Sequence, residues 1–211
     1  MSAASWLAST MPTRRAAFLF SAAGPALILA IATVFHPAHL TDVTAARWLA
    51  LHFGLIVIFP LVGFAPWLIA RTAGRGFGVA AGILGLFYAA FYTSLDVLAG
   101  VGAGSLQLTG HADAKGPLYA QGHVVATIGV VALVLAVLVA SIAAISRFGL
   151  RALPGAVLAL AGSVLLYSSH IYFGWGTVSM LLLASGFGWL AWTVSAPSAT
   201  ERPAQEQAPA Q

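Results

Sequence analysis

The stretch Trp48–Ala70, WLALHFGLIVIFPLVGFAPWLIA, decides the fold class because it runs for 23 residues without a formal charge. About 20 helical residues suffice to cross the hydrocarbon core of a bilayer. The apolar character is continuous, with no alternation at every second residue, so the pattern favours helices over a barrel. Five more stretches of this kind occur: Ala16–Phe35, Gly76–Gly102, Leu118–Ser146, Leu153–Tyr172 and Thr177–Val194. We therefore predict an all-α integral membrane protein, an up-and-down bundle of six transmembrane helices.

Composition supports the same class. Of the 211 residues, 60% are hydrophobic and only 7% are charged, whereas soluble domains carry about 25% charged residues. The chain has no cysteine, which excludes disulfides, thiolate metal sites and c-type haem attachment. The basic residues lie in pairs between apolar stretches rather than along one face, so we expect no nucleic-acid partner.

The basic residues also predict the orientation. Lys and Arg are enriched in cytoplasmic loops. Seven of the nine fall on one side of the six predicted crossings, and Arg47 and Lys115 fall on the other. We expect a multi-pass protein of the cell membrane with both termini cytoplasmic: a short segment at 1–15, a transmembrane domain at 16–194 and a disordered tail at 195–211.

Four ionisable residues lie near the outer ends of four consecutive predicted helices: His52, Asp96, His123 and His170. Helical rise places them about 3–9 Å below the outer interface. Asp96 is the one formal charge within the predicted spans, and ionisable groups in membranes usually face the bundle interior or a wet cavity. This layer predicts a polar pocket between the second and fifth helices, open toward the outside.

One interpretation of the layer is a haem site. His52 and His123 have similar depths and equivalent places in two helical hairpins of similar pattern, so they are candidate axial ligands of a b-type haem. Six helices with such a pair resemble the transmembrane b-type cytochromes of the ascorbate-reducing class, which hold haem within a four-helix bundle. The chain lacks the second, cytoplasmic-side histidine pair of that family. The resemblance implies a redox subunit with haem.

A second interpretation is a divalent metal site made by His52, Asp96, His123 and His170, a donor set suited to Zn²⁺. His36, His39 and Asp42 form a compact trio at the membrane surface and add to this pattern. Histidines this close to the interface also commonly contact lipid headgroups or water, and this is the simpler expectation for His36, His39, His111 and His170 taken singly.

A third interpretation needs no cofactor. Asp96, Tyr92 and His170 are candidate catalytic residues for acid/base chemistry on an apolar lipid- or isoprenoid-like substrate. Tyr88, Tyr92 and Asp96 are spaced four residues apart and share one helix face. A structural or accessory subunit, whose polar groups only pack and which joins a homo- or hetero-oligomer, is the remaining alternative.

Overall fold

The computed structural model describes residues 3–195, and side chains from Thr13 onward. This part of the chain is all-helical and contains no strand. The long helices are α1 (Ala3–Phe35), α2 (Ala45–Ala70), α3 (Arg75–Leu95), α5 (Gly116–Phe148), α6 (Leu153–Ser169) and α7 (Trp175–Val194). The shorter elements are the π-helical turn η1 (Asp96–Gly102), α4 (Ala103–Leu108) and two 3-10 turns, η2 (Ala112–Lys115) and η3 (Gly149–Ala152).

Five helical stretches of the described chain are long and apolar enough to cross a membrane. They are Thr13–Phe35, Ala45–Ala70, Arg75–Leu108, Ala112–Ser169 and Trp175–Val194. The fourth has 58 residues and contains both α5 and α6. The chain reverses between these two helices at η3, where Gly149 has a φ of 66°. The all-helical prediction is confirmed, and the apolar helices suggest a membrane location.

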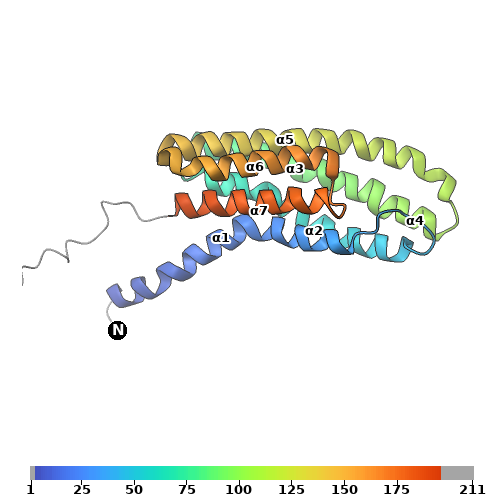
Figure 1. Cartoon of the computed structure of the whole chain (residues 1–211), viewed down its shortest axis with the longest axis horizontal. Coiled ribbons are helices and arrows are strands. Elements are labelled where there is room, and N and C mark those ends of the chain that lie inside the picture. The colour runs from blue at the N-terminus through green and yellow to red at the C-terminus, as the bar shows by residue number, and fades with distance from the viewer. Residues whose placement is uncertain (1–2, 196–211) are drawn as a thin grey trace, which may run out of the picture.

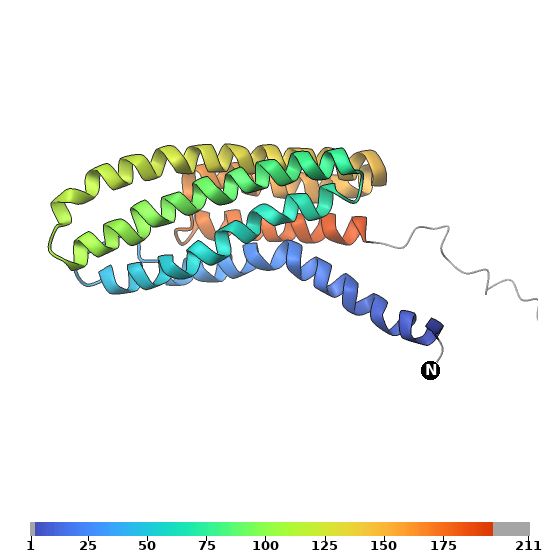
Figure 2. The same cartoon turned by 180° about the vertical axis from the view of Figure 1, so that it is seen from behind.

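The long helices form a closed bundle in chain order. Each packs against the next, and α7 also packs against α1. Figures 1 and 2 show the helices running lengthwise beside one another, while the first turns of α1 diverge from the bundle. Residues 36–44, 109–115 and 170–174 connect helices at one end, here called the histidine end. The connections at Arg71–Gly74 and at η3 lie at the opposite end.

Helices α2 and α3 approach each other closely enough for backbone contact. A Cβ atom on Gly85 would lie 2.2 Å from the carbonyl oxygen of Gly63, and one on Gly63 would lie 2.5 Å from that of Gly85. Large apolar side chains nevertheless cover the outside of the bundle, as Phe20 and Leu86 illustrate at 68% and 69% exposure. Water-soluble proteins rarely expose such surfaces, and lipid tails would cover them.

Helix boundaries differ from the predicted spans by three residues or more at four helix ends, one of which is the start of α2 at Ala45 rather than Trp48. α1 begins at Ala3 rather than Ala16, because hydropathy detects apolar residues whereas a helix continues through polar ones such as Arg14. The third helix continues past the predicted end at Gly102 through η1 to Leu108. α6 ends at Ser169 rather than Tyr172, since the next residue leaves helical backbone geometry. The predicted tail lies outside the described residues except for Ser195.

Candidate functional site

Three imidazoles from three separate segments meet at the histidine end. His36 follows α1, His52 lies two turns into α2, and His170 follows α6. One ring nitrogen of each lies within 4.8 Å of one ring nitrogen of each of the other two. His36 and His52 are buried and His170 is partly exposed. We call this group the histidine triad.

The triad is held by aromatic packing. The ring of His52 stacks on Trp48 with centroids 4.8 Å apart, and the ring of His36 lies edge-on to both, at 5.0 Å from Trp48 and 5.2 Å from His52. Tyr172 contacts the other side of His36 at 4.7 Å. These contacts restrict the orientations of the His36 and His52 rings.

Each triad ring also has its Nδ1 atom hydrogen-bonded to an oxygen. His36 Nδ1 lies 2.8 Å from the carbonyl oxygen of Pro37, and His52 Nδ1 lies 2.8 Å from that of Trp48. A carbonyl can only accept, so both Nδ1 atoms carry the proton and both Nε2 atoms keep a lone pair. His170 Nδ1 lies 2.6 Å from the hydroxyl of Tyr92, which can donate or accept.

His36 is neutral at ordinary pH. Burial is the main cause that lowers its pKa from 6.5 to about 4, with smaller contributions from His52 and Arg47, while the bond to Pro37 acts in the opposite direction. Its Nε2 atom is buried without a hydrogen-bond partner among the described residues. A neutral imidazole with a free lone pair is the form that binds metal ions.

His170 reaches the triad through an unusual backbone conformation. It caps the C-terminus of α6 with a φ of 47° and a ψ of −138°, and it is the one residue other than glycine in the described chain with positive φ. Such a conformation costs about 1–3 kcal/mol for a residue with a Cβ atom. The chain therefore maintains a strained residue at the position that directs this imidazole toward the other two.

Asp96 lies beside the triad. Its Oδ1 is 3.8 Å from His52 Nε2, its side chain is fully buried, and neither carboxyl oxygen has a hydrogen bond to the described residues. Asp96 begins the π-helical turn η1, a type of distortion that frequently occurs at functional sites. The indole nitrogen of Trp48 donates to the Ala99 and Gly100 carbonyls of this turn, at 3.3 and 3.2 Å.

Gly100 makes room for His52. A Cβ atom at position 100 would lie 2.2 Å from Cδ2 of the His52 ring, a distance that no side chain could tolerate without displacing the imidazole. The π-helical turn thus has two roles. Its carbonyl groups accept the hydrogen bonds of Trp48, and its glycine leaves space for the His52 ring.

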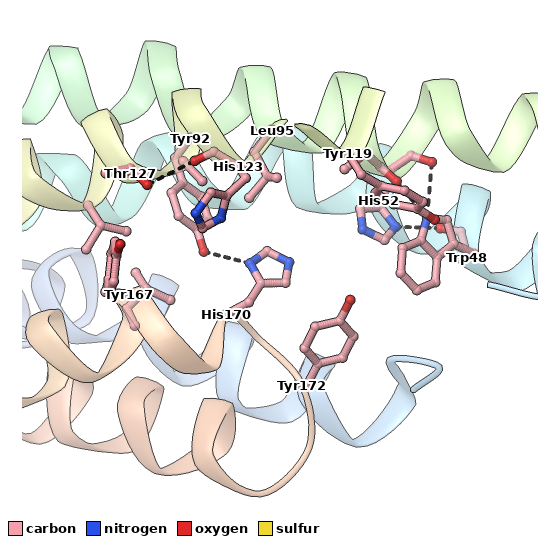
Figure 3. A pocket seen from close by; sticks show the side chains of 15 residues that line it. Trp48, His52, Tyr92, Leu95, Tyr119, His123, Thr127, Tyr167, His170 and Tyr172 are labelled. Carbon is pink, nitrogen blue, oxygen red and sulfur yellow. Dashed lines mark hydrogen bonds between the residues drawn. The ribbon is translucent and has the colours of Figure 1, made fainter. Parts of the chain in front are cut away.

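A cavity of about 190 Å³ adjoins the triad. His52 and His170 belong to its lining, together with Tyr92 and with His123 from α5. Figure 3 shows His170 between Tyr92 and Tyr172, with His52 and Trp48 together at another side of the cavity. The walls come from α2, α3, η1, α5 and α6, which are the helices expected to enclose a polar pocket.

The structure brings together most of the predicted site residues, but not all of them. His52, Asp96 and His170 lie close together, and Tyr92 lies beside His170. His123 lines the cavity from an exposed position on α5 and is not part of the group whose nitrogens converge. His36 takes that place instead.

Sequence reasoning assigned His36 to a surface trio with His39 and Asp42. The structure separates them: His36 is buried, and the other two are exposed. The one feature of the sequence that relates to the position of His36 is that the pair His36-Pro37 directly follows an apolar helix. The inward direction of His36 goes with a local backbone bond from His36 N to Thr33 O and with one tertiary contact, the Thr33–Thr177 hydroxyl contact of 2.7 Å between α1 and α7.

No family model matches the chain, and neither a curated protein nor a solved structure matches it.

Proposed function

We propose that this protein is a six-span membrane protein whose histidine triad, His36, His52 and His170, binds one divalent transition-metal ion near the outer face. One observation carries the proposal: in all three rings Nδ1 is hydrogen-bonded to an oxygen, while a nitrogen of each converges on one point. Metal-binding histidines almost always use this arrangement, in which the second ring nitrogen bonds to an oxygen and orients the ligand.

The donor set suits Zn²⁺ or Cu²⁺. Three neutral imidazoles with a fourth position left for water or another ligand are typical of catalytic zinc sites, and imidazole also suits copper. Zn–N bonds of about 2.0–2.1 Å in a tetrahedral site put nitrogens about 3.3 Å apart. Nitrogens that already lie within 4.8 Å need to approach by at most about 1.5 Å, which small rotations of the rings can supply.

The geometry favours an ion over a haem. The Nε2 atom of His52 faces Asp96 at 3.8 Å, and the other side of that ring is occupied by Gly100 and Trp48. The adjoining cavity, about 190 Å³, is smaller than the roughly 300–1,000 Å³ of sites for drug-sized ligands, and a porphyrin is larger still than most of these. A haem between His52 and His123 would require a rearrangement of all these groups.

The proposed orientation in the membrane depends on the distribution of basic residues between the two ends of the bundle. Arg71, Arg75, Arg147 and Arg151 lie at the end opposite the histidines, and the excess of basic residues at that end favours its placement in the cytoplasm. The reversal at η3 divides the longest apolar stretch into two helices, which brings the number of proposed spans to six. With six spans, both termini lie on the cytoplasmic side.

Asp96 supports a second candidate function, a cofactor-free enzyme for an apolar substrate. A fully buried carboxyl group with no hydrogen bond to either oxygen in the described chain is costly to maintain in a membrane and is by default a functional residue. Tyr92 and His170 lie on the same cavity. In this case the protein would work with no metal bound.

The test is metal binding by the full chain, purified in detergent without a polyhistidine tag, stripped with a chelator and titrated with Zn²⁺, Cu²⁺ and Co²⁺. We expect one ion per chain by elemental analysis. We expect Co²⁺ to give the visible absorption of a four-coordinate site. His36→Ala, His52→Ala and His170→Ala should each lose the ion.

His39→Ala and His111→Ala are the matched controls, because both side chains are exposed and outside the triad. Both should retain full stoichiometry. Absence of bound metal in the wild-type protein, or equal loss in the control variants, would reject the metal site. Activity that persists in metal-free protein and disappears in Asp96→Asn would establish the cofactor-free alternative.

A further inference from the structure

The cavity beside the triad has the size of one six-membered ring. An engineered protein cavity of about 150 Å³ holds benzene, and the cavity here measures about 190 Å³. A ring with small substituents fits this volume, whereas an extended acyl chain or a fused multi-ring system does not.

The lining suits a flat ring that carries oxygen. Five aromatic side chains contribute to it, and aromatic faces and edges pack favourably against another ring at centroid distances of 4.5–7 Å. They are Trp48, Tyr92, Tyr119, Tyr167 and Tyr172. His123, Tyr119 and Tyr167 also line the cavity, and the imidazole and the two hydroxyl groups can each donate a hydrogen bond to a ligand oxygen.

The cavity contains no Lys, Arg, Asp or Glu in its lining. A charged ligand would therefore find no oppositely charged side chain in the lining to offset its lost hydration, at a high cost in free energy. A neutral ligand is favoured.

The opening of the cavity lies between α5 and α6. On α5, Tyr119 and His123 are exposed, and on α6 Tyr167 is 55% exposed, although all three line the cavity. The opposite wall is closed by Tyr92 and Gly100, which are buried. Because the exposed residues lie on helices proposed to span the membrane, the opening faces lipid and not only water.

We propose that this cavity binds the head ring of a membrane-soluble amphiphile, a six-membered ring with hydroxyl or carbonyl oxygens as in hydroquinones and benzoquinones. The ring enters between α5 and α6, and its apolar tail remains in the lipid. One ring oxygen faces His52 and His170, next to the metal; this last element rests on the proposed function, whereas the volume and lining of the cavity do not depend on it.

The test measures ligand binding to the full chain in lipid nanodiscs by calorimetry, with empty nanodiscs to subtract partitioning into lipid. Three probes share a ten-carbon tail: a decyl-substituted benzoquinone, the corresponding hydroquinone and n-decanol. We expect saturable binding of at least one of the two ring compounds and none of n-decanol. Equal binding of n-decanol and both ring compounds would overturn the ring assignment.

Two variants of α5 make a matched pair. Ala126 lines the cavity, so Ala126→Leu fills part of it and should weaken ring binding at least tenfold. Ala120 is exposed on the same helix and outside the lining, so Ala120→Leu should change affinity less than twofold. Equal affinities in the two variants would overturn the proposal.

Tyr167→Ala provides a second variant in case Ala126→Leu fails to fold, because its side chain is largely exposed and its loss should leave the bundle intact. We expect severalfold weaker ring binding, and unchanged affinity would count against the proposal. Metal stoichiometry is measured on the same samples. Ring binding without any metal would reject the proposed function and the metal-facing oxygen but keep the ring cavity, and metal binding without ring binding would reject the cavity alone.

Discussion

The hydroxyl of Tyr92 on α3 lies 2.6 Å from Nδ1 of His170, which follows α6. This contact joins two segments that are 78 residues apart, and the ring of Tyr92 is held in turn by Phe59 at 4.7 Å and Tyr88 at 5.3 Å. The orientation of His170, the one non-glycine residue with positive φ in the described chain, thus depends on a hydrogen bond from a different helix. Tyr92 is therefore a positioning residue of the triad.

Tyr92→Phe should weaken metal binding about 10- to 100-fold, the usual effect of removing a hydrogen bond that orients a metal ligand. The aromatic packing remains, so the fold should be kept. Tyr88→Phe is the control: the Tyr88 hydroxyl is buried and has no partner in the described part of the chain, so its removal should leave metal affinity unchanged and stability equal or higher. Titration with Zn²⁺ measures the metal affinity of each variant, and thermal unfolding measures its stability. Equal metal affinities for the two variants would contradict the role of Tyr92.

Gly100→Ala should displace the His52 ring, because the new methyl group would lie 2.2 Å from Cδ2 of that ring. We expect at least tenfold weaker metal binding. Gly54→Ala, on the same helix as His52, meets no atom within 4 Å and should bind metal as the wild type does. Unchanged metal affinity in Gly100→Ala would show that the ring position seen here is not needed for binding.

Asp96→Asn should separate stability from function. Replacing this buried carboxyl, which makes no hydrogen bond to the described residues, with an amide of the same shape removes the possibility of a buried negative charge, so the metal-free protein should keep or gain thermal stability. Metal affinity should fall, since a negative charge beside His52 attracts the cation. Differential scanning calorimetry and metal titration on the same sample test this, and a lower unfolding temperature together with unchanged affinity would be the contrary result.

Substitutions at His170 should reveal the backbone strain at its φ of 47°. His170→Gly and His170→Ala both remove the imidazole and should both lose the metal. Glycine tolerates positive φ and alanine does not, so metal-free His170→Gly should be more stable than His170→Ala by about 1–2 kcal/mol. Denaturant or thermal unfolding gives the difference; a more stable alanine variant would mean that the strain is absent in the membrane.

The proposed orientation can be tested with single cysteines, because the native chain has none. Asp113→Cys lies at the histidine end and Ala73→Cys at the opposite end, between α2 and α3. A membrane-impermeant maleimide added to intact cells should label position 113 and spare position 73 until the cells are lysed. The reverse pattern would place the triad on the cytoplasmic side.

The helices and the end of the bundle that carries the polar residues follow from the sequence alone. Hydropathy is a local property, so runs such as Trp48–Ala70 identify apolar helices without knowledge of any contact. The depth of His52 and Asp96 follows from counting residues along a helix of known rise. The same counting places His170 near that layer, and the spacing of four residues puts Tyr92 on the helix face of Asp96.

The membership of the triad was decided by tertiary structure. Whether His36 turns inward depends on the loop after α1 and on the contact between α1 and α7, and neither is encoded in hydropathy. His123, which has the right depth, remains exposed on α5 because depth along a helix does not determine which way a side chain faces. Convergence of three nitrogens requires the helices to be placed relative to one another, which residue spacing within single helices does not specify.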